Sequence, residues 1–416
     1  MNSRRVIISP ILYSRCRRAA CKALTLAAIA YAFNVGNIFA DEKSGPWNLP
    51  ELKQTPKAEF GPANGLVRPV YYAGEPLQGK PTRVFAWYAR PAGAGPFPAV
   101  VLVHGGQGKA FRDWALHWAD RGYAALAMDL NGQGPEGPLP DGGPDQSDET
   151  KFRQFENSGV RDMWSYHAVA AVIRGHSLLA AQLGVDPNRI GITGISWGGY
   201  LTCIVAGLDD RLKAAVPVYG CGFLADNSAW TETWFRPRPA KQHERWVRNF
   251  DPSQYLPNVR CPILFLNSTT DFAYPLDSYR KSYRLVNQHL RTIALIPRLQ
   301  HGHIWTFPEV DQFMDSKLRD SQTLPQLGPL QTDAGKAKTT VRSTTEIKEA
   351  ALHYTLDQGA WQKREWKAIP AVLAGESVSV AIPEGVTAYY LAVRDARGLT
   401  VSTEYDQIVD PSSGGR

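Results

Sequence analysis

The stretch that decides the fold reads Val185-Asp186-Pro187-Asn188-Arg189-Ile190-Gly191-Ile192-Thr193-Gly194-Ile195-Ser196-Trp197-Gly198-Gly199-Tyr200. The apolar run over 189–195 predicts a buried strand, and a helical pattern follows over 197–207. Glycine at 194 and 198 permits a turn so tight that side chains there would collide with the neighbouring strand and helix. The arrangement is that of a nucleophile elbow, and it predicts that Ser196 projects from the strand tip with its hydroxyl exposed.

Outward from this turn, short apolar runs alternate with helical patterns. Most of these runs are continuously apolar, as strands covered on both faces must be. The alternation predicts an α/β fold, a mainly parallel sheet with helices on both faces. The predicted strands are 83–88, 98–103, 124–129, 189–195, 214–219, 262–267 and 292–297, and the predicted helices are 111–120, 160–183, 197–207, 276–290 and 308–318.

Two stretches interrupt the alternation. Residues 131–149 are rich in Gly, Pro and Asp, which predicts a long irregular loop. Residues 226–251 carry Trp230, Trp234 and other aromatic residues among prolines and arginines, between two predicted strands. Long insertions in compact domains often serve function, so this one is expected to cover a site.

The pattern changes after residue 325. Six short alternating segments are separated by turn residues, as is typical of a small antiparallel β-sandwich of the fibronectin or immunoglobulin kind. We therefore predict one domain over 41–325 and a β-sandwich over 326–416. The six segments are 337–343, 350–355, 364–369, 377–382, 388–394 and 399–402.

The N-terminal forty residues have the pattern of a targeting segment. Six basic and no acidic residues are followed by an apolar run over 23–33, and Ile38-Phe39-Ala40 precedes an acidic pair. This predicts a cleaved secretory signal over 1–40, with an uncleaved anchor as the alternative, and no membrane span once the signal is removed. The protein is therefore expected to be exported, to the periplasm or the medium.

The net charge of +7 is concentrated in that segment. Of 46 basic and 39 acidic residues, removing the six leaves 40 against 39, so the remaining chain is close to neutral. The high isoelectric point therefore gives no case for nucleic-acid binding, and nucleic acid is not an expected partner. The sequence does not indicate an oligomeric state.

A second motif, His104-Gly105-Gly106-Gln107-Gly108, follows the strand predicted over 98–103. Backbone N–H groups aimed at a developing oxyanion are a major source of acyl-transfer catalysis. We expect the N–H groups of Trp197 and Gly106 to form this oxyanion hole, with Gln107 as a less favoured replacement for Gly106. His104 is expected to anchor the loop rather than to act as a base.

Serine becomes a good nucleophile only when a base removes its proton and an acid orients that base. The acid should follow a strand tip beyond Ser196, and Asp271, after 262–267, fits better than Asp277 or Asp251. The base should follow the last strand, where His301 is favoured and His303 is the alternative.

Neither metal nor cofactor is indicated. The His301-Gly302-His303 pair lacks further ligands at metal-binding spacing. Beyond the signal, the three cysteines Cys203, Cys221 and Cys261 show no CxxC spacing, and we expect buried thiols, with one bridge and one free thiol as the alternative.

From about Pro98 to Phe313 the chain resembles the α/β-hydrolase superfamily, in particular its acetyl xylan esterase and prolyl-oligopeptidase-like branches, which include dienelactone-hydrolase-like members. The resemblance rests on the region 185–200 quoted above, on Asp271 followed by Pro275, and on Pro297 followed by His301. That last spacing favours His301 over His303. Too few residues precede the first core strand for a β-propeller, and Ser196 stands where dienelactone hydrolases carry cysteine.

The resemblance implies a Ser196-Asp271-His301 triad that works without a cofactor through an acyl-enzyme. The expected function is an exported carboxylic-ester hydrolase acting on a small ester or on acetylated oligosaccharide or polysaccharide. Two alternatives remain: a serine exopeptidase or amidase with the same triad, and a non-catalytic polysaccharide-binding protein.

Overall fold

The computed structural model describes residues 44–153, 159–305 and 307–408. The predicted signal over 1–40 lies outside these residues. Residues 46–416 form one compact unit, and within its described part no helix is long and apolar enough to cross a membrane. The division into domains at residue 325 remains a prediction.

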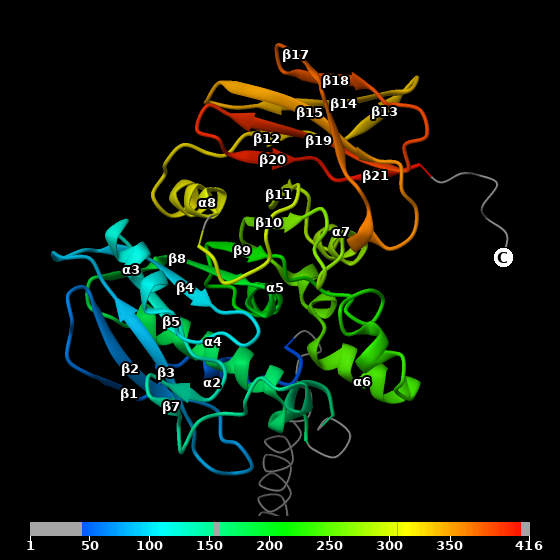
Figure 1. Cartoon of the computed structure of the whole chain (residues 1–416). Helices are drawn as coiled ribbons and strands as arrows, with labels where there is room; N and C mark the ends of the chain where they lie inside the picture. The colour runs from blue at the N-terminus through cyan, green and yellow to red at the C-terminus, as the bar shows by residue number, and fades with distance from the viewer. Residues whose placement is uncertain (1–43, 154–158, 306, 409–416) are drawn as a thin grey trace, which may run out of the picture. The chain divides into compact units, whose positions relative to one another are not determined.

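A nine-stranded sheet forms the centre of the fold (Figure 1). Its order is β1-β2-β3-β5-β4-β8-β9-β10-β11, with parallel pairing from β5 to β11 and antiparallel pairing from β1 to β5. The predicted mainly parallel sheet is therefore confirmed. The bounds are β1 Ala58–Phe60, β2 Val67–Ala73, β3 Arg83–Ala89, β4 Phe97–Val103, β5 Ala124–Met128, β8 Val185–Ile195, β9 Ala214–Val218, β10 Ile263–Ser268 and β11 Arg291–Ile296.

Helices cover both faces of this sheet, as predicted. On one face lie α3 (Arg112–Asp120) and α8 (Pro308–Leu318), and His117 Nε2 of α3 is 3.1 Å from a carboxylate oxygen of Asp311 on α8. On the other face, α4 (Trp164–Ala180) and α5 (Trp197–Leu208) lie side by side, and the short α2 (Leu49–Leu52) contacts α4.

Two predicted helices are shorter in the structure. The helix expected over 160–183 is a 3-10 turn, Val160–Asp162, followed by α4. The helix expected over 276–290 is α7, Leu276–Arg284, because the Asn287 side chain accepts a hydrogen bond from the His289 N–H and forms a turn instead.

The two irregular stretches have different structures. After β5, the Asp129 carboxylate accepts hydrogen bonds from Asn131 N and Gln133 N at 2.8 and 2.7 Å, and the chain forms only the two-residue strands β6 (Gln133–Gly134) and β7 (Gly137–Pro138). The insertion over 226–251 contains α6, Ala240–Phe250, whose buried Trp246 and Phe250 are four residues apart on one helix face.

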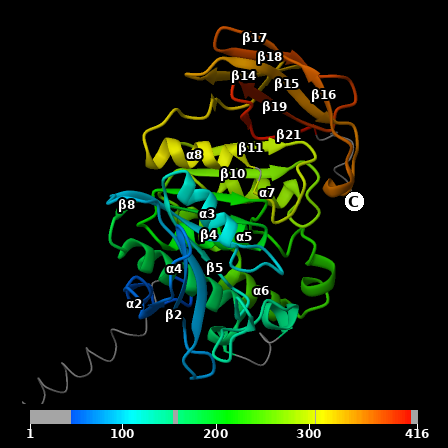
Figure 2. The ribbon, with the colours of Figure 1, turned by 60° about the vertical axis from the view of Figure 1, so that its left-hand side comes forward.

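The C-terminal residues form two antiparallel sheets, as predicted (Figure 2). The short strands β12, β13, β17 and β21 were not predicted, because two or three residues carry no readable alternation. One sheet contains β12 (Gln326–Leu327), β13 (Gln331–Asp333), β14 (Lys336–Arg342), β18 (Ser377–Ala381) and β17 (Val372–Ala374), and the other contains β16 (Lys367–Pro370), β15 (Ile347–Thr355), β19 (Ala388–Asp395), β20 (Thr400–Ser402) and β21 (Asp406–Gln407).

The second of these sheets contacts the edge strand β11. Leu295 N donates to Ser402 Oγ at 3.0 Å, and the Tyr390 hydroxyl donates to Leu295 O at 3.3 Å. Thr400 N donates to a carboxylate oxygen of Glu309 on α8 at 3.0 Å. The side chains of Ser402 and Tyr390 thus join the C-terminal sheets to the last strand of the large sheet, and the Thr400 N–H joins them to α8.

Cys203, Cys221 and Cys261 are buried free thiols, which confirms that prediction over a disulfide. Within residues 44–153, 159–305 and 307–408, no group of three or more His, Cys, Asp or Glu side chains could hold a metal ion.

Candidate active site

The turn between β8 and α5 has the conformation that its glycines predict. Ser196 has φ 59° and ψ −117°, a left-handed backbone that costs energy for a residue with a Cβ. A Cβ on Gly194 would lie 2.3 Å from Gly198 O, and one on Gly198 would lie 2.1 Å from Val103 O. Backbone atoms therefore fill the space on both sides of Ser196, and only glycine fits at positions 194 and 198.

Asp271 and His301 are brought together at the strand ends. His301 Nδ1 lies 2.6 Å from Asp271 Oδ2, and the carboxylate is buried. The other oxygen, Oδ1, accepts hydrogen bonds from Ala273 N at 2.9 Å and Tyr274 N at 2.7 Å. Because Asp271 engages Nδ1, Nε2 is the ring nitrogen of His301 that can exchange a proton.

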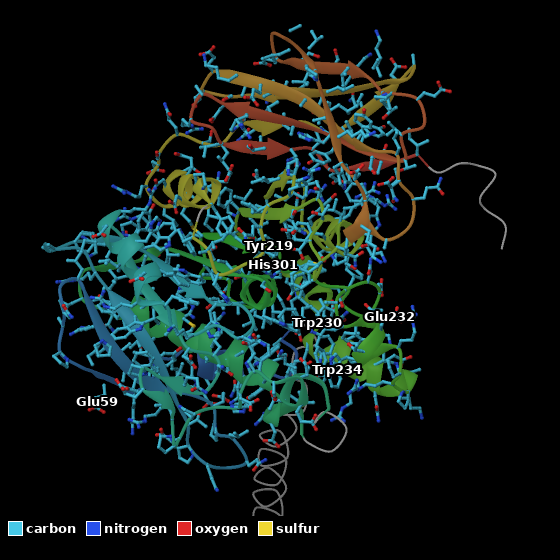
Figure 3. The ribbon with its side chains drawn as sticks, in the orientation of Figure 1. Glu59, Tyr219, Trp230, Glu232, Trp234 and His301 are labelled. Atoms are coloured by element: carbon cyan, nitrogen blue, oxygen red, sulfur yellow. The ribbon has the colours of Figure 1, made fainter. Side chains whose placement is uncertain are left out.

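Aromatic rings hold the His301 ring in place. Tyr219 lies beside it (Figure 3) and stacks on it, with ring centroids 4.4 Å apart and an interplanar angle of 17°. The centroid of the Phe272 ring lies 4.9 Å from that of His301. The Tyr219 hydroxyl donates to Gln300 O, one residue before His301. The base candidate is thus oriented by a carboxylate and by ring packing.

His303 has a different partner. Its Nε2 accepts a hydrogen bond from Gly105 N at 3.1 Å, and its ring packs against Phe111 at 5.1 Å. Burial lowers the pKa of His303, which favours the neutral ring that this bond needs. The structure therefore joins Asp271 to His301, while His303 supports the loop after β4.

His104 anchors the same loop. Leu130 N donates to its Nε2 at 2.8 Å, and its Nδ1 lies 2.7 Å from Gly105 O. Burial lowers the pKa of His104 to about 4, so the ring is neutral at pH 7 and donates from Nδ1. Both ring nitrogens are occupied by backbone groups, as expected of an anchor.

Some backbone N–H groups at the site have hydrogen-bond partners within the protein and others do not. Gly105 N bonds His303, and Gln107 N donates to Gln146 Oε1 at 2.9 Å. In the part of the chain that the structure describes, the N–H groups of Gly106 and Trp197 have no hydrogen-bond partner. A Cβ on Gly106 would lie 3.0 Å from the Trp197 ring, so the two residues are neighbours. They are the pair predicted to bind the oxyanion.

Beside the elbow lies a group of aromatic residues, which we call the aromatic wall: Trp197, Trp230, Trp234, Phe152 and Tyr274. The ring centroid of Trp230 lies 4.6 Å from that of Trp197 and 5.4 Å from that of Tyr274. The Trp234 ring stacks on Phe152 with centroids 5.5 Å apart. Trp230 and Trp234 both come from the 226–251 insertion (Figure 3). Trp305, in contrast, packs against Trp114 and Trp118 of α3.

The sequence did not indicate three members of this region: Phe152, Tyr274 and Lys151. The buried ammonium of Lys151 lies 4.7 Å from the centre of the Trp197 ring and 3.3 Å from an Asp148 carboxylate oxygen, and burial lowers its pKa. Phe152 and Lys151 lie in a stretch without a readable motif. Tyr274 could have been noticed, because it stands between Asp271 and Pro275.

The parallel sheet, the glycine-flanked turn and the strand-end loops form the α/β-hydrolase fold, which the chain shares with solved acetyl xylan esterases. Residues 57–255 match the model of the family described as acetyl xylan esterase (AXE1). The matched region includes the turn at Ser196 and ends before Asp271 and His301.

Individual proteins agree with this placement. The acetyl xylan esterase from Paenibacillus sp. R4 has the same fold, with a TM-score of 0.54 and 23% identity over 66% of this chain and 92% of that one. A protein of Methylorubrum extorquens assigned as a carboxymethylenebutenolidase is 30% identical over 172 residues, 40% of this chain and 53% of that protein. Peptidase YuxL of Bacillus subtilis is 23% identical over 234 residues, 53% of this chain and 33% of that protein. The chain thus spans about half or less of these two relatives.

Proposed function

We propose that the protein is a serine carboxylic-ester hydrolase that removes acetyl groups from an acetylated oligosaccharide or polysaccharide. The contact that carries this proposal is the 2.6 Å hydrogen bond between His301 Nδ1 and the buried Asp271 carboxylate. It lies at the ends of the parallel strands, where the turn after β8 presents Ser196. The acetyl and polysaccharide parts rest on the acetyl xylan esterase family match, and export rests on the sequence pattern over 1–40.

In the proposed mechanism, Ser196 Oγ attacks the acyl carbonyl carbon while His301 Nε2 takes the hydroxyl proton. Asp271 stabilises the resulting imidazolium. The N–H groups of Gly106 and Trp197 bind the oxyanion, and the positive end of α5 adds to their field. His301 then returns its proton to the leaving alcohol, and a water molecule repeats the sequence on the acyl-enzyme. The chemistry needs no cofactor.

Steady-state hydrolysis of p-nitrophenyl esters of increasing acyl length tests the proposal. We expect the acetate to be cleaved fastest and Ser196→Ala to lose activity by about 10⁴-fold or more, since removal of a triad member leaves only binding and oxyanion stabilisation. Acetyl release from acetylated xylan is the next measurement. Export is tested separately, by locating the protein in cell fractions.

Hydrolysis of aminoacyl p-nitroanilides in preference to esters would favour the exopeptidase or amidase alternative, which the relative YuxL supports. An inactive protein that binds xylan equally well with or without Ser196 would favour the non-catalytic alternative. Either result would contradict the esterase proposal.

A further inference from the structure

Phe272 is an exposed residue in a turn that is otherwise buried. It is 62% exposed, more than any other Phe, Tyr or Trp in residues 44–153, 159–305 and 307–408, whereas Asp271, Ala273 and Tyr274 are buried. The Asp271 carboxylate accepts hydrogen bonds from Ala273 N at 2.9 Å and Tyr274 N at 2.7 Å. The turn that carries Phe272 is therefore fixed by the same carboxylate that engages His301.

The exposed ring lies beside the proposed base. Its centroid is 4.9 Å from that of His301, and the two ring planes meet at 51°. The rings of Tyr219 and Tyr274 also lie near His301, but both residues are fully buried. The His301 side chain itself is 14% exposed. Among the aromatic neighbours of His301 in the described chain, only Phe272 is thus open to a molecule that arrives from solvent.

The proposed mechanism determines which part of a substrate meets this ring. His301 Nε2 returns its proton to the leaving alcohol, and that transfer brings the alcohol oxygen within about 3 Å of the nitrogen. The acyl carbonyl is held instead at Ser196 and the oxyanion N–H groups. The alcohol moiety is therefore the part of the substrate that lies next to His301 and can cover Phe272.

The chemistry of an exposed phenyl ring selects among alcohols. The ring face carries partial negative charge, and covering it removes apolar surface from water. A pyranose ring suits such a face, because its C–H groups form an apolar side with partial positive charge while its hydroxyl groups point outward to water. A short alkyl alcohol covers much less of the ring.

We propose that Phe272 is a specificity-determining residue that binds the leaving alcohol by stacking on a sugar ring. The inference rests on the esterase function proposed above and deepens it, because it assigns a substrate class: acetate esters whose alcohol is a pyranose. Phe272 takes no part in making or breaking bonds.

The test measures kcat/KM of the full chain for a mono-acetylated xylobiose and for ethyl acetate, and takes the ratio of the two. Both substrates use His301, so a shift of that ring in Phe272→Ala changes both values and cancels in the ratio. We expect the ratio to fall about 10-fold in Phe272→Ala and to stay near wild type in Phe272→Tyr, which keeps the ring face. p-Nitrophenyl acetate is unsuitable, because its own ring would stack on Phe272.

Leu183→Ala is the control for loss of an exposed apolar side chain. Leu183 is 86% exposed and lies just before β8, at the opposite end of that strand from Ser196, so its ratio should equal that of wild type. An unchanged ratio in Phe272→Ala would overturn the proposal, and if both kcat/KM values fell together, Phe272 would only position His301. An equal fall of the ratio in Leu183→Ala would overturn it as well.

The wild-type protein separates this inference from the proposed function. If it cleaves ethyl acetate but not the acetylated xylobiose, the esterase chemistry stands and the sugar-binding role of Phe272 fails. If it cleaves neither ester, the proposed function fails, and the inference that rests on it fails too.

Discussion

The turn around Ser196 and the 226–251 insertion both border the candidate site, but different atoms hold them in place. At the turn, backbone atoms fill the space on either side of the serine. A Cβ on Gly198, for example, would lie 2.1 Å from Val103 O. In the insertion, rings from separate segments pack together, as where Trp230 meets Trp197 and Trp234 meets Phe152.

This difference separates two kinds of tolerance to substitution. Backbone contacts cannot yield to an added methyl group without moving the sheet, whereas packed rings can be exchanged for smaller ones at the cost of a cavity. The proposed chemistry is thus tied to the rigid region, and the shape of the acyl site to the adaptable one. Four predictions test this comparison.

The largest effect is expected at the turn itself. Gly198→Ala should abolish ester hydrolysis and destabilise the fold by about 3 kcal/mol or more, because the new methyl group overlaps Val103 O. Gly302→Ala is the control, since its Cβ would meet nothing closer than Ile304 at 4.0 Å. Urea denaturation and turnover should be measured for both variants, and a stable, active Gly198→Ala protein would remove the distinction drawn between the regions.

The next largest effect separates the two histidines. His301→Gln should lower kcat by about 10⁴-fold, because it removes the proposed base. His303→Gln should cost roughly 10-fold, through displacement of the loop that Gly105 N anchors. Steady-state kinetics of the two variants checks this, and the reverse ranking would assign the base to His303.

The aromatic wall should respond by a change of specificity. Trp230→Ala opens space beside Trp197 and Tyr274, so hydrolysis of the butyrate should rise about 10-fold relative to the acetate. Trp305→Ala is the control, because Trp305 packs against α3. An unaltered acyl preference in Trp230→Ala would mean that the insertion does not shape the acyl site.

The smallest effect is expected on the stability of the fold at low pH, through His104 in the loop after β4. The pKa of His104 is about 4 in the folded protein and about 6.5 in the unfolded chain, so between these values the unfolded chain binds the extra proton. Stability should therefore fall as the pH drops from 6.5 to 4, by at most about 1.4 kcal/mol per pH unit from this residue. Urea titrations at pH 7 and 5 should show a smaller loss in His104→Gln, and an equal loss would contradict the prediction.

The alternation of strands and helices along the chain was predictable because buried parallel strands are apolar runs. The turn at Ser196 was predictable because its flanking glycines follow from local steric limits. The strands β1 and β2 were not predicted, because β2 mixes polar residues and Pro69 into an antiparallel strand near the sheet edge. Likewise, α6 was not predicted, since its only buried residues are Trp246 and Phe250 within a polar sequence.

For the site, the sequence narrowed the base to two histidines but could not reveal their partners. That His301 bonds Asp271 and His303 bonds Gly105 depends on contacts across about 30 and 198 residues of chain. The same holds for Tyr274 and Lys151, whose surroundings come from other segments. The spacing of residues in the sequence predicts the order of the site residues along the chain. Which group each histidine nitrogen contacts depends on tertiary contacts, which the spacing does not reveal.

The contact between β11 and the C-terminal sheets has a consequence for the protein's solubility. β11 is the last strand of the large sheet, and an uncovered strand edge is a template for intermolecular pairing. Ser402 and Tyr390 engage the N–H and carbonyl of Leu295 on that strand, so another chain cannot add to the sheet there. The C-terminal sheets therefore cover the edge strand β11, which would otherwise be open to intermolecular pairing.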